Sequence, residues 1–327
     1  MIDLTLFHGW IPYRVEWRGY GPEVDWCYLG ERPFREPFFD HTIRSVLRDP
    51  FHLSARHHTP IQALADMRAV RPGLPLGGLI FHMSRCGSTL ISRLLASSPT
   101  NLVLSEAPPI DEVLDMARRG ASEEQRIAWL RGLVSALGQP RTGQEQRMFI
   151  KLDSWHVLDL PLIRRAFPDT PWIFVYRDPV EVMMSHKQLR GSQMAPGQLP
   201  PARLGLDATA VQLPLDLDKF CARVLGNFCT AAAQYAPMHG GMLVNYNQFP
   251  DAIWSDILPW FRVAPTEAER EEMELEMMYH AKQPAHPFQP DSEAKRRAAS
   301  PELRALAEQF IAPAYYQLEA VRQNHAA

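Results

Sequence analysis

Residues 79–95, LIFHMSRCGSTLISRLL, restrict the fold of this chain more than any other stretch. The apolar run at 79–81 predicts a buried strand, and apolar residues at 90, 91, 94 and 95 recur at helical spacing after the polar turn 84–89. A strand that turns directly into a helix gathers unpaired backbone N–H groups and the positive end of the helix dipole at one point. Such a point favours an anion, and above all a phosphate.

The turn itself has the composition of a phosphate loop. Gly87 lets the backbone approach a ligand closely, Ser88 and Thr89 offer hydroxyls, Arg85 adds a fixed charge, and Cys86 lies between them. The same strand, turn and helix also occur in α/β proteins without such a site, so the stretch alone leaves both interpretations open. A nucleoside-triphosphate loop reads G-x-x-x-x-G-K-[ST], and the absence of a lysine after Gly87 disfavours a magnesium-dependent phosphotransferase.

A second motif follows the strongest β signal in the chain, at residues 172–176. This strand ends in Arg177-Asp178-Pro179, and the helix that begins there carries Ser185. Arg177 offers a forked, charge-assisted grip on a phosphate, and Ser185 is within reach of the same group. The alternative is an ordinary helix start with proline at the first helical position.

The remaining pattern predicts a doubly wound α/β domain. Strands are expected at 79–81, 101–106, 148–152, 172–176 and 242–246, with helical stretches between them, and this alternation is typical of a mostly parallel sheet. Ligands of such sheets bind at the carboxyl ends of the strands. Five chemically useful residues fall at or just beyond those ends and therefore predict one shared site: Ser84, Glu106, Lys151, Arg177 and Tyr246.

The first 75 residues have a different texture. They are rich in aromatic residues, with short strands expected at 14–17 and 26–29 and a helical pattern from 38 to 70 that is broken at Pro50 and Pro60. The Pro- and Gly-rich stretch 71–78 marks a boundary. We therefore predict an N-terminal extension at 1–75, whose role the sequence does not show, and a nucleotide-binding catalytic domain at 76–327. Residues 190–215 read as a long loop.

Composition limits the possible partners and compartment. The net charge of −3 gives no general attraction to nucleic acid or to an anionic membrane. The four cysteines show neither metal spacing nor a disulfide framework, which favours a reducing, cytoplasmic location. No signal peptide, membrane span or metal-ligand cluster is recognised in the sequence.

Together the two motifs resemble the sulfotransferases that use 3′-phosphoadenosine 5′-phosphosulfate (PAPS). S-R-C-G-S-T-L is similar to the R-[SC]-G-[ST]-T-L loop of the carbohydrate and tyrosylprotein branches, and R-D-P followed by serine is similar to the element that binds the 3′-phosphate. The resemblance spans roughly residues 77–320. It implies a P-loop-like nucleotide site, PAPS as co-substrate, and metal-independent transfer of a sulfuryl group to an acceptor hydroxyl or amine.

The resemblance also implies roles for the strand-end residues. Arg85 and Lys151 would stabilise the sulfuryl oxygens and the leaving phosphate oxygen, and Glu106 matches the general base of the carbohydrate and tyrosylprotein branches. Asp153 is the second candidate base, because it stands where the cytosolic branch has its catalytic histidine. The alternative to catalysis is structural: Glu106 would be a carboxylate stabilised by the dipole at a helix start, and Asp153 would be a helix cap.

Two further residues match family elements at the nucleotide end. Tyr246 corresponds to a tyrosine that contacts adenine, although Asn247-Gln248 replaces the acidic pair expected after it. Arg296, in a basic run near the C-terminus, would close over the 3′-phosphate. A half-buried strand tyrosine and a solvated helix face are the respective alternatives. Histidines near the motifs are candidates by proximity alone: His82, His156 and His186.

The acceptor is expected to be a small molecule. The apolar 190–215 loop and the aromatic N-terminus favour an apolar or aromatic acceptor pocket, and the oligomeric state cannot be read from the sequence. Two other functions remain open: a catalytically inactive nucleotide-binding or adaptor protein on this fold, and a P-loop phosphotransferase that requires magnesium.

Overall fold

The computed structural model describes residues 7–207, 209, 215–236, 241–280, 283–287 and 291–325. Its centre is a five-stranded sheet in the order β5-β6-β4-β7-β8. The strands are β4 (Leu76–His82), β5 (Asn101–Ser105), β6 (Arg147–Lys151), β7 (Trp172–Tyr176) and β8 (Gly241–Asn245). All four neighbouring pairs run parallel, so the predicted fold class and all five predicted strands are confirmed.

The sequence of the central strands explains why they are buried. Every residue of β7, WIFVY, is fully buried, as expected for a parallel strand that is covered by helices on both faces. β4 pairs with β6 on one side and with β7 on the other, which places the phosphate loop at the centre of the carboxyl edge.

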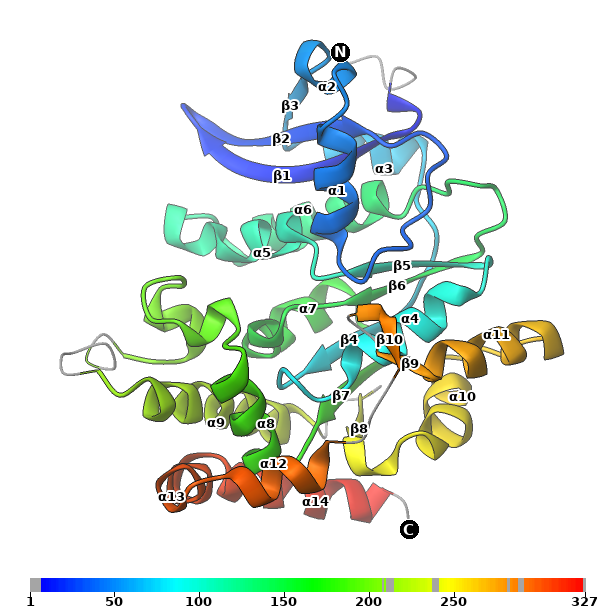
Figure 1. The fold of residues 1–327 in the computed structure, drawn as a ribbon. Coiled ribbons are helices and arrows are strands. Elements are labelled where there is room, and N and C mark those ends of the chain that lie inside the picture. Colours follow the sequence, from blue (N-terminus) through cyan, green and yellow to red (C-terminus); the bar gives the residue numbers. More distant parts are fainter. Residues whose placement is uncertain are drawn as a thin grey trace.

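Helices surround this sheet (Figure 1). Those of the main domain are α4 (Ser88–Ser97), α5 (Pro108–Asp115), α6 (Glu123–Leu137), α7 (Leu160–Ala166), α8 (Pro179–Gln188), α9 (Leu217–Tyr235), α10 (Leu258–Trp260), α11 (Glu267–Met277), α12 (Ser292–Ala298), α13 (Pro301–Phe310) and α14 (Ala312–His325). Short 3-10 helices include η3 (Ser154–Asp159), η4 (Ser192–Met194) and η5 (Pro201–Leu204), so the described part of the predicted 190–215 loop contains two helical turns. A two-stranded antiparallel sheet, β9 (Tyr279–His280) and β10 (Gln283–Pro287), follows α11.

The N-terminal segment forms its own small antiparallel sheet at the opposite end of the molecule from α12–α14 (Figure 1). β1 (Trp10–Arg18) and β2 (Gly21–Tyr28) form the predicted hairpin. A third strand, β3 (His57–Pro60), interrupts the region predicted as helical, where α1 (Phe39–Leu47), α2 (Phe51–Ser54) and α3 (Ala63–Val70) lie. Pairing with β2 overrides the local pattern there, because Trp26 Nε1 on β2 donates to Thr59 Oγ1 on β3 at 3.0 Å.

The N-terminal sheet packs on the main domain. β1 contacts α5, and α3 packs against α6. The carboxylate of Glu112 on α5 accepts the backbone N–H of Val15 on β1, so a charged side chain joins the two parts. Burial raises the pKa of Glu112 to about 7, and the charge of Asp111 adds to this, although the bond from Val15 opposes it.

Candidate active site

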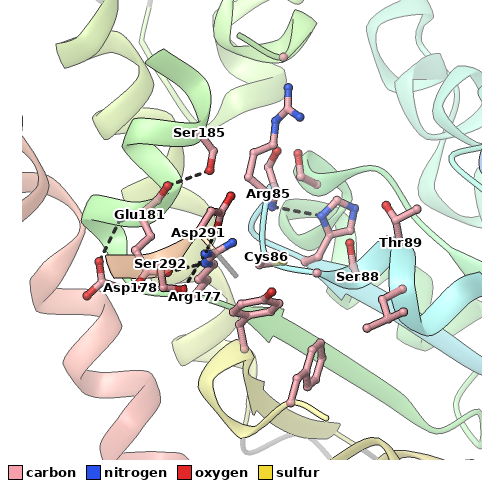
Figure 2. Close-up of a pocket in the computed structure, with 18 of the residues that line it drawn as sticks. Arg85, Cys86, Ser88, Thr89, Arg177, Asp178, Glu181, Ser185, Asp291 and Ser292 are labelled. Carbon is pink, nitrogen blue, oxygen red and sulfur yellow. Dashed lines mark hydrogen bonds and ion pairs between the residues drawn. The ribbon is translucent and has the colours of Figure 1, made fainter. Parts of the chain in front are cut away.

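A cavity of about 1030 Å³ opens at the carboxyl edge of the central sheet. It is lined by the strand ends and by the segments at 153–155, 189–193 and 291–296, and Figure 2 shows the part around the two phosphate motifs. Lys151 does not line this cavity. The other eleven predicted site residues do: Arg85, Cys86, Gly87, Ser88, Thr89, Glu106, Asp153, Arg177, Ser185, Tyr246 and Arg296.

The phosphate loop has an unusual backbone. Ser84 and Arg85 have φ angles of 81° and 52°, in the left-handed region that L-residues rarely adopt. Gly87, the N-cap of α4, has a φ of 87°, and a Cβ atom there would lie 2.6 Å from Cδ2 of Tyr246. Glycine is therefore required for both its conformation and its close contact. Backbone strain of this kind clusters at ligand-binding sites.

Two side chains of the loop are held by backbone carbonyls. Arg85 Nη2 donates to Leu189 O at 2.5 Å, which ties the phosphate loop to the segment after α8. Cys86 Sγ donates to Val175 O at 3.1 Å and is fully buried. The thiol of Cys86 thus faces the core, and this residue offers only its backbone to a ligand.

Arg177 sits in a frame of acceptors. Its Nε donates to Glu181 Oε2 at 2.6 Å, and its Nη2 donates to Asp291 Oδ1 and to Ser292 Oγ, both at 2.9 Å (Figure 2). Its guanidinium carbon lies 4.2 Å from the ring centroid of Tyr246. Nη1 has no hydrogen bond to any residue that the structure describes, so one corner of the fork is available to a ligand.

The other predicted phosphate ligands gather around the same frame. Ser185 Oγ donates to Glu181 O at 2.8 Å, one turn back along α8. Arg296 Nη1 lies 3.4 Å from Glu181 Oε1, and Lys295 Nζ lies 2.5 Å from Asp291 Oδ2. Three cations and two carboxylates therefore share one corner of the cavity, brought together from the end of β7, from α8 and from the start of α12.

Glu106 lies on the other side of the phosphate loop, in the left-handed region with a φ of 53°. Its carboxylate forms an ion pair with Lys151, which is 1% exposed, and lies 3.6 Å from His82 Nε2. Burial alone would raise the pKa of Glu106, but the charge of Lys151 and the contacts with His82 outweigh it and hold this pKa well below its usual range. His82 also reaches the phosphate loop, because its Nδ1 accepts the N–H of Ser84 at 3.1 Å.

Lys151 stands behind Glu106, away from the cavity. On its far side the ring centroid of Phe38, from the N-terminal segment, lies 5.3 Å from its Nζ. Among the described residues, those that line the cavity all come from positions 82–315, and none belongs to the N-terminal segment, so the lining gives no support to the expectation that the aromatic N-terminus forms part of the pocket. The N-terminal segment instead reaches the site indirectly, through Lys151.

Asp153 occupies the N-cap of η3, as its alternative interpretation predicted. Its side chain is 12% exposed, and its carboxylate lies 4.0 Å from Nδ1 of His156. Burial raises the pKa of Asp153 to about 7; the charge of His156 opposes this increase and that of Glu106 adds to it. His156 is committed elsewhere, since its Nε2 lies 2.9 Å from Asp111 Oδ1.

Sequence reasoning missed several of these residues. Glu181 follows Arg177 by one helical turn, so the spacing that favours ion pairs on a helix could have revealed it. Asp291 and Ser292 lie far along the chain, without a local signal. Gln193 was also missed: its Nε2 donates to Ser84 Oγ and to Ser154 Oγ, each at 3.2 Å. The third histidine considered, His186, accepts the N–H of Gly191 at 3.3 Å and is buried.

Three further features complete the description of these residues. No group of three or more His, Cys, Asp or Glu among them could hold a metal ion. All four cysteines are free and buried. In the part of the chain that the structure describes, no helix is long and apolar enough to cross a membrane.

The fold is that of an α/β protein with a parallel sheet, and its cavity contains both of the predicted phosphate motifs. Residues 79–213 match the sequence model of the sulfotransferase family, a segment that contains the phosphate loop, Glu106 and the Arg177 motif. This match, over 135 of the 327 residues, confirms the resemblance of this part of the chain to the sulfotransferase family and supports sulfotransferase as the class of enzyme. No curated protein sequence matches the chain significantly.

Several solved structures align with the chain at low identity. The sulfotransferase domain from the curacin biosynthetic pathway is 14% identical, covers 72% of this chain and 98% of its own, and gives a TM-score of 0.44. A sulfotransferase from Mycobacterium avium is 15% identical, with 83% of each chain covered and a TM-score of 0.44. One from Alicyclobacillus acidocaldarius is 15% identical, with 76% of this chain and 96% of its own covered and a TM-score of 0.44. The assignment rests on the family match and the motifs, not on these alignments.

Proposed function

We propose that the protein transfers the sulfuryl group of PAPS to a hydroxyl or amine of a small acceptor. The observation that carries this proposal is that one cavity holds the phosphate loop, the Arg177 corner and Glu106. Two candidate anion sites in one cavity, at the phosphate loop and at the Arg177 corner, suit a donor that carries both a 3′-phosphate and a 5′-phosphosulfate. A nucleotide with only a 5′-phosphate chain would leave the Arg177 corner without a ligand.

The 3′-phosphate binds at the Arg177 corner. Nη1 of Arg177, the hydroxyl of Ser185 and the guanidinium of Arg296 supply donors, and charge-assisted bonds of this type are the strong ones. The carboxylates of Glu181 and Asp291 hold the cations in place before the ligand arrives. Tyr246, stacked on Arg177, forms the adjoining wall and suits the adenine ring.

The 5′-phosphosulfate binds at the phosphate loop. The backbone N–H groups at the start of α4 and the hydroxyls of Ser88 and Thr89 face the anion, and the helix dipole favours it. Arg85 leaves Leu189 O and turns to the sulfuryl oxygens. In the transition state the acceptor oxygen attacks sulfur as the bond from sulfur to the bridging phosphate oxygen breaks. Fixed positive charge stabilises the oxygens on which negative charge grows.

Glu106 is the proposed general base. It is ionised at neutral pH and lines the cavity, so it can take the proton that the acceptor hydroxyl loses, although its ion pair with Lys151 lowers its pKa and makes it a weaker base. Lys151 is a positioning residue that acts through Glu106, since its ammonium is buried against that carboxylate. Asp153 is the second candidate base. Turnover of a neutral alcohol by variants of each residue distinguishes the two candidate bases. Glu106→Gln should lower kcat by about a hundredfold or more, and Asp153→Asn should lower it by less.

Isothermal titration with 3′-phosphoadenosine 5′-phosphate tests the donor site. We expect micromolar binding with a chelator present, lost in Arg85→Ala and Arg177→Ala and retained in Arg119→Ala, an exposed arginine outside the cavity. If Arg85→Ala and Arg177→Ala bind the nucleotide as tightly as the wild type, the nucleotide binds elsewhere. No binding by the wild type, or equal binding of ATP with magnesium, would overturn the PAPS assignment. Binding without transfer to any acceptor would favour the inactive nucleotide-binding alternative.

A further inference from the structure

His82, the last residue of β4, contacts the phosphate loop and the neighbourhood of Glu106 with one imidazole ring. The residue lines the cavity but is only 5% exposed. Its Nδ1 lies 3.1 Å from the backbone nitrogen of Ser84, and its Nε2 lies 3.0 Å from the carbonyl oxygen of Leu152. Nε2 is also 3.6 Å from Oε1 of Glu106. Opposite edges of the ring therefore face the two parts of the site that the proposed reaction requires.

The two backbone partners of the ring fix its tautomer. The N–H of Ser84 can only donate, so Nδ1 must hold a lone pair. The carbonyl oxygen of Leu152 can only accept, so Nε2 must carry the proton. His82 is therefore neutral, and it has no nitrogen that could take a proton while both bonds hold. These bonds exclude His82 as the general base, although a histidine beside a cavity is often the first candidate.

The Nδ1 edge supports the strained start of the phosphate loop. Ser84 has a φ of 81°, a conformation that a residue with a side chain keeps only when its surroundings hold it. His82 holds its backbone N–H, and Gln193 Nε2 donates to its Oγ at 3.2 Å. Because Arg85 and Gly87 follow directly in the same loop, we expect loss of the acceptor at Nδ1 to disturb the binding of a phosphate there.

The Nε2 edge acts on the proposed base. Glu106 also has a positive φ, and its backbone N–H donates to the carbonyl oxygen of Lys151 at 2.7 Å, one residue before Leu152. The bond to Leu152 keeps the Nε2 proton of His82 beside the carboxylate of Glu106. Burial raises the pKa of Glu106, but Lys151 and then His82 lower it well below its usual range. This edge of the ring therefore helps to keep Glu106 ionised and in place.

We propose that His82 is a positioning residue that holds the phosphate loop through Nδ1 and Glu106 through Nε2, in its neutral Nε2–H form. The inference rests on the proposed function and adds to it a residue that lies outside both phosphate motifs. His82 acts through Ser84 and Glu106. Since the two contacts use different ring atoms, each can be removed while the other is kept.

Two amide variants separate the contacts. In His82→Asn the side-chain oxygen can occupy the place of Nδ1 and accept from Ser84, but the shorter side chain does not reach Leu152. In His82→Gln the side-chain nitrogen can occupy the place of Nε2 and donate to Leu152, but Ser84 loses its acceptor. His52→Asn and His52→Gln are the matched controls, because His52 is a buried histidine of α2 that does not line the cavity.

Binding and turnover should respond to opposite variants. In titrations with 3′-phosphoadenosine 5′-phosphate we expect His82→Gln to raise Kd about tenfold, as for a buried donor left without its partner, and His82→Asn to change it little. Release of this nucleotide from saturating PAPS, with 1-butanol or water as acceptor, gives kcat. We expect His82→Asn to lower kcat about tenfold and His82→Gln to keep most of it. A merely structural role would lower both quantities together in each variant, along with the melting temperature.

The tautomer is measured separately and without any ligand. Two-bond proton–nitrogen NMR spectra of the protein with nitrogen-15-labelled histidine distinguish protonated from unprotonated ring nitrogens, and the signals missing in His82→Gln identify His82. We expect an unprotonated Nδ1 and a protonated Nε2 at about pH 7.5, where an ordinary histidine is neutral. A proton on Nδ1 would overturn the inference.

Equal effects of the two amide variants on binding and on turnover, or wild-type values in both, would also overturn it. A wild type that binds 3′-phosphoadenosine 5′-phosphate but turns over PAPS with neither acceptor would have no base to position, which would refute the role of the Nε2 edge. Failure of the proposed function is distinct from these results, since the wild type would then not bind the nucleotide. The NMR measurement would still decide whether His82 holds Ser84.

Discussion

Arg85 Nη2 donates to the carbonyl oxygen of Leu189 at 2.5 Å, and this bond joins the phosphate loop to the segment that follows α8. Gln193, in the same segment, donates to Ser84 Oγ at 3.2 Å. The phosphate loop and this segment are therefore in contact before any ligand binds. A donor that draws Arg85 towards its sulfuryl oxygens breaks the first of these bonds and leaves the second.

Replacement of Arg85 should affect the chemical step more than the fold. In Arg85→Ala we expect kcat/KM to fall by about a hundredfold, because one fixed donor to the developing charge is lost. Arg85→Lys keeps the charge but not the forked geometry, and should lie between the wild type and Arg85→Ala. Steady-state kinetics with PAPS and thermal unfolding of each variant check this. A large drop in melting temperature with kcat unchanged would contradict the role.

Gly87 should not tolerate a side chain, because a Cβ atom there would clash with Tyr246. Gly120 has a similar backbone conformation without a close neighbour, so it separates the steric effect from backbone strain. Gly87→Ala strains the backbone by about 1–2 kcal/mol and drives a Cβ atom to 2.6 Å from Tyr246 Cδ2. Gly120→Ala is the matched control, since Gly120 has a φ of 86° with nothing within 4 Å. We expect backbone strain to lower the stability of both variants, and we expect only Gly87→Ala to lose binding of 3′-phosphoadenosine 5′-phosphate. Equal binding by both would show that the contact with Tyr246 is unimportant.

The Lys151–Glu106 pair should respond non-additively to mutation. Lys151→Met leaves Glu106 without its main counter-charge and should cost about 3 kcal/mol in urea unfolding at pH 7. Glu106→Gln in the same chain should recover much of that loss, since no uncompensated charge remains. The depressed pKa of Glu106 means that its contribution is present above about pH 4 and disappears as pH falls through its folded-state pKa. Additive losses in the double variant would argue against a coupled pair.

Docking of the N-terminal sheet should weaken as pH rises. Glu112, which accepts the N–H of Val15, has its pKa raised to about 7, so the folded state holds this proton more tightly than the unfolded state does. Its contribution is complete below about pH 4 and is lost between there and pH 7. Glu112→Gln keeps the acceptor without the charge and should be more stable than the wild type at pH 8, by on the order of 2 kcal/mol. Urea unfolding from pH 5 to 8 measures the difference, which should shrink towards the acidic end.

Local sequence patterns were enough to predict the scaffold of the site. Each of the five strands is a short apolar run, and the carboxyl ends of parallel strands meet at one edge, so Arg85, Glu106 and Arg177 could be expected in one place. These inferences depend on local patterns: the period of apolar residues, a glycine at a turn, and a proline at a helix start.

The contacts of each group depend on how the whole chain packs. Lys151 is at a strand end as expected, yet it lies behind Glu106 with Phe38 on its far side. Asp291 reaches Arg177 across more than a hundred positions of sequence, and Arg203 pairs with both Asp111 and Asp159. Ion pairing and desolvation depend on the whole packed neighbourhood of a group, whereas a linear motif records only the group and its immediate neighbours in the chain.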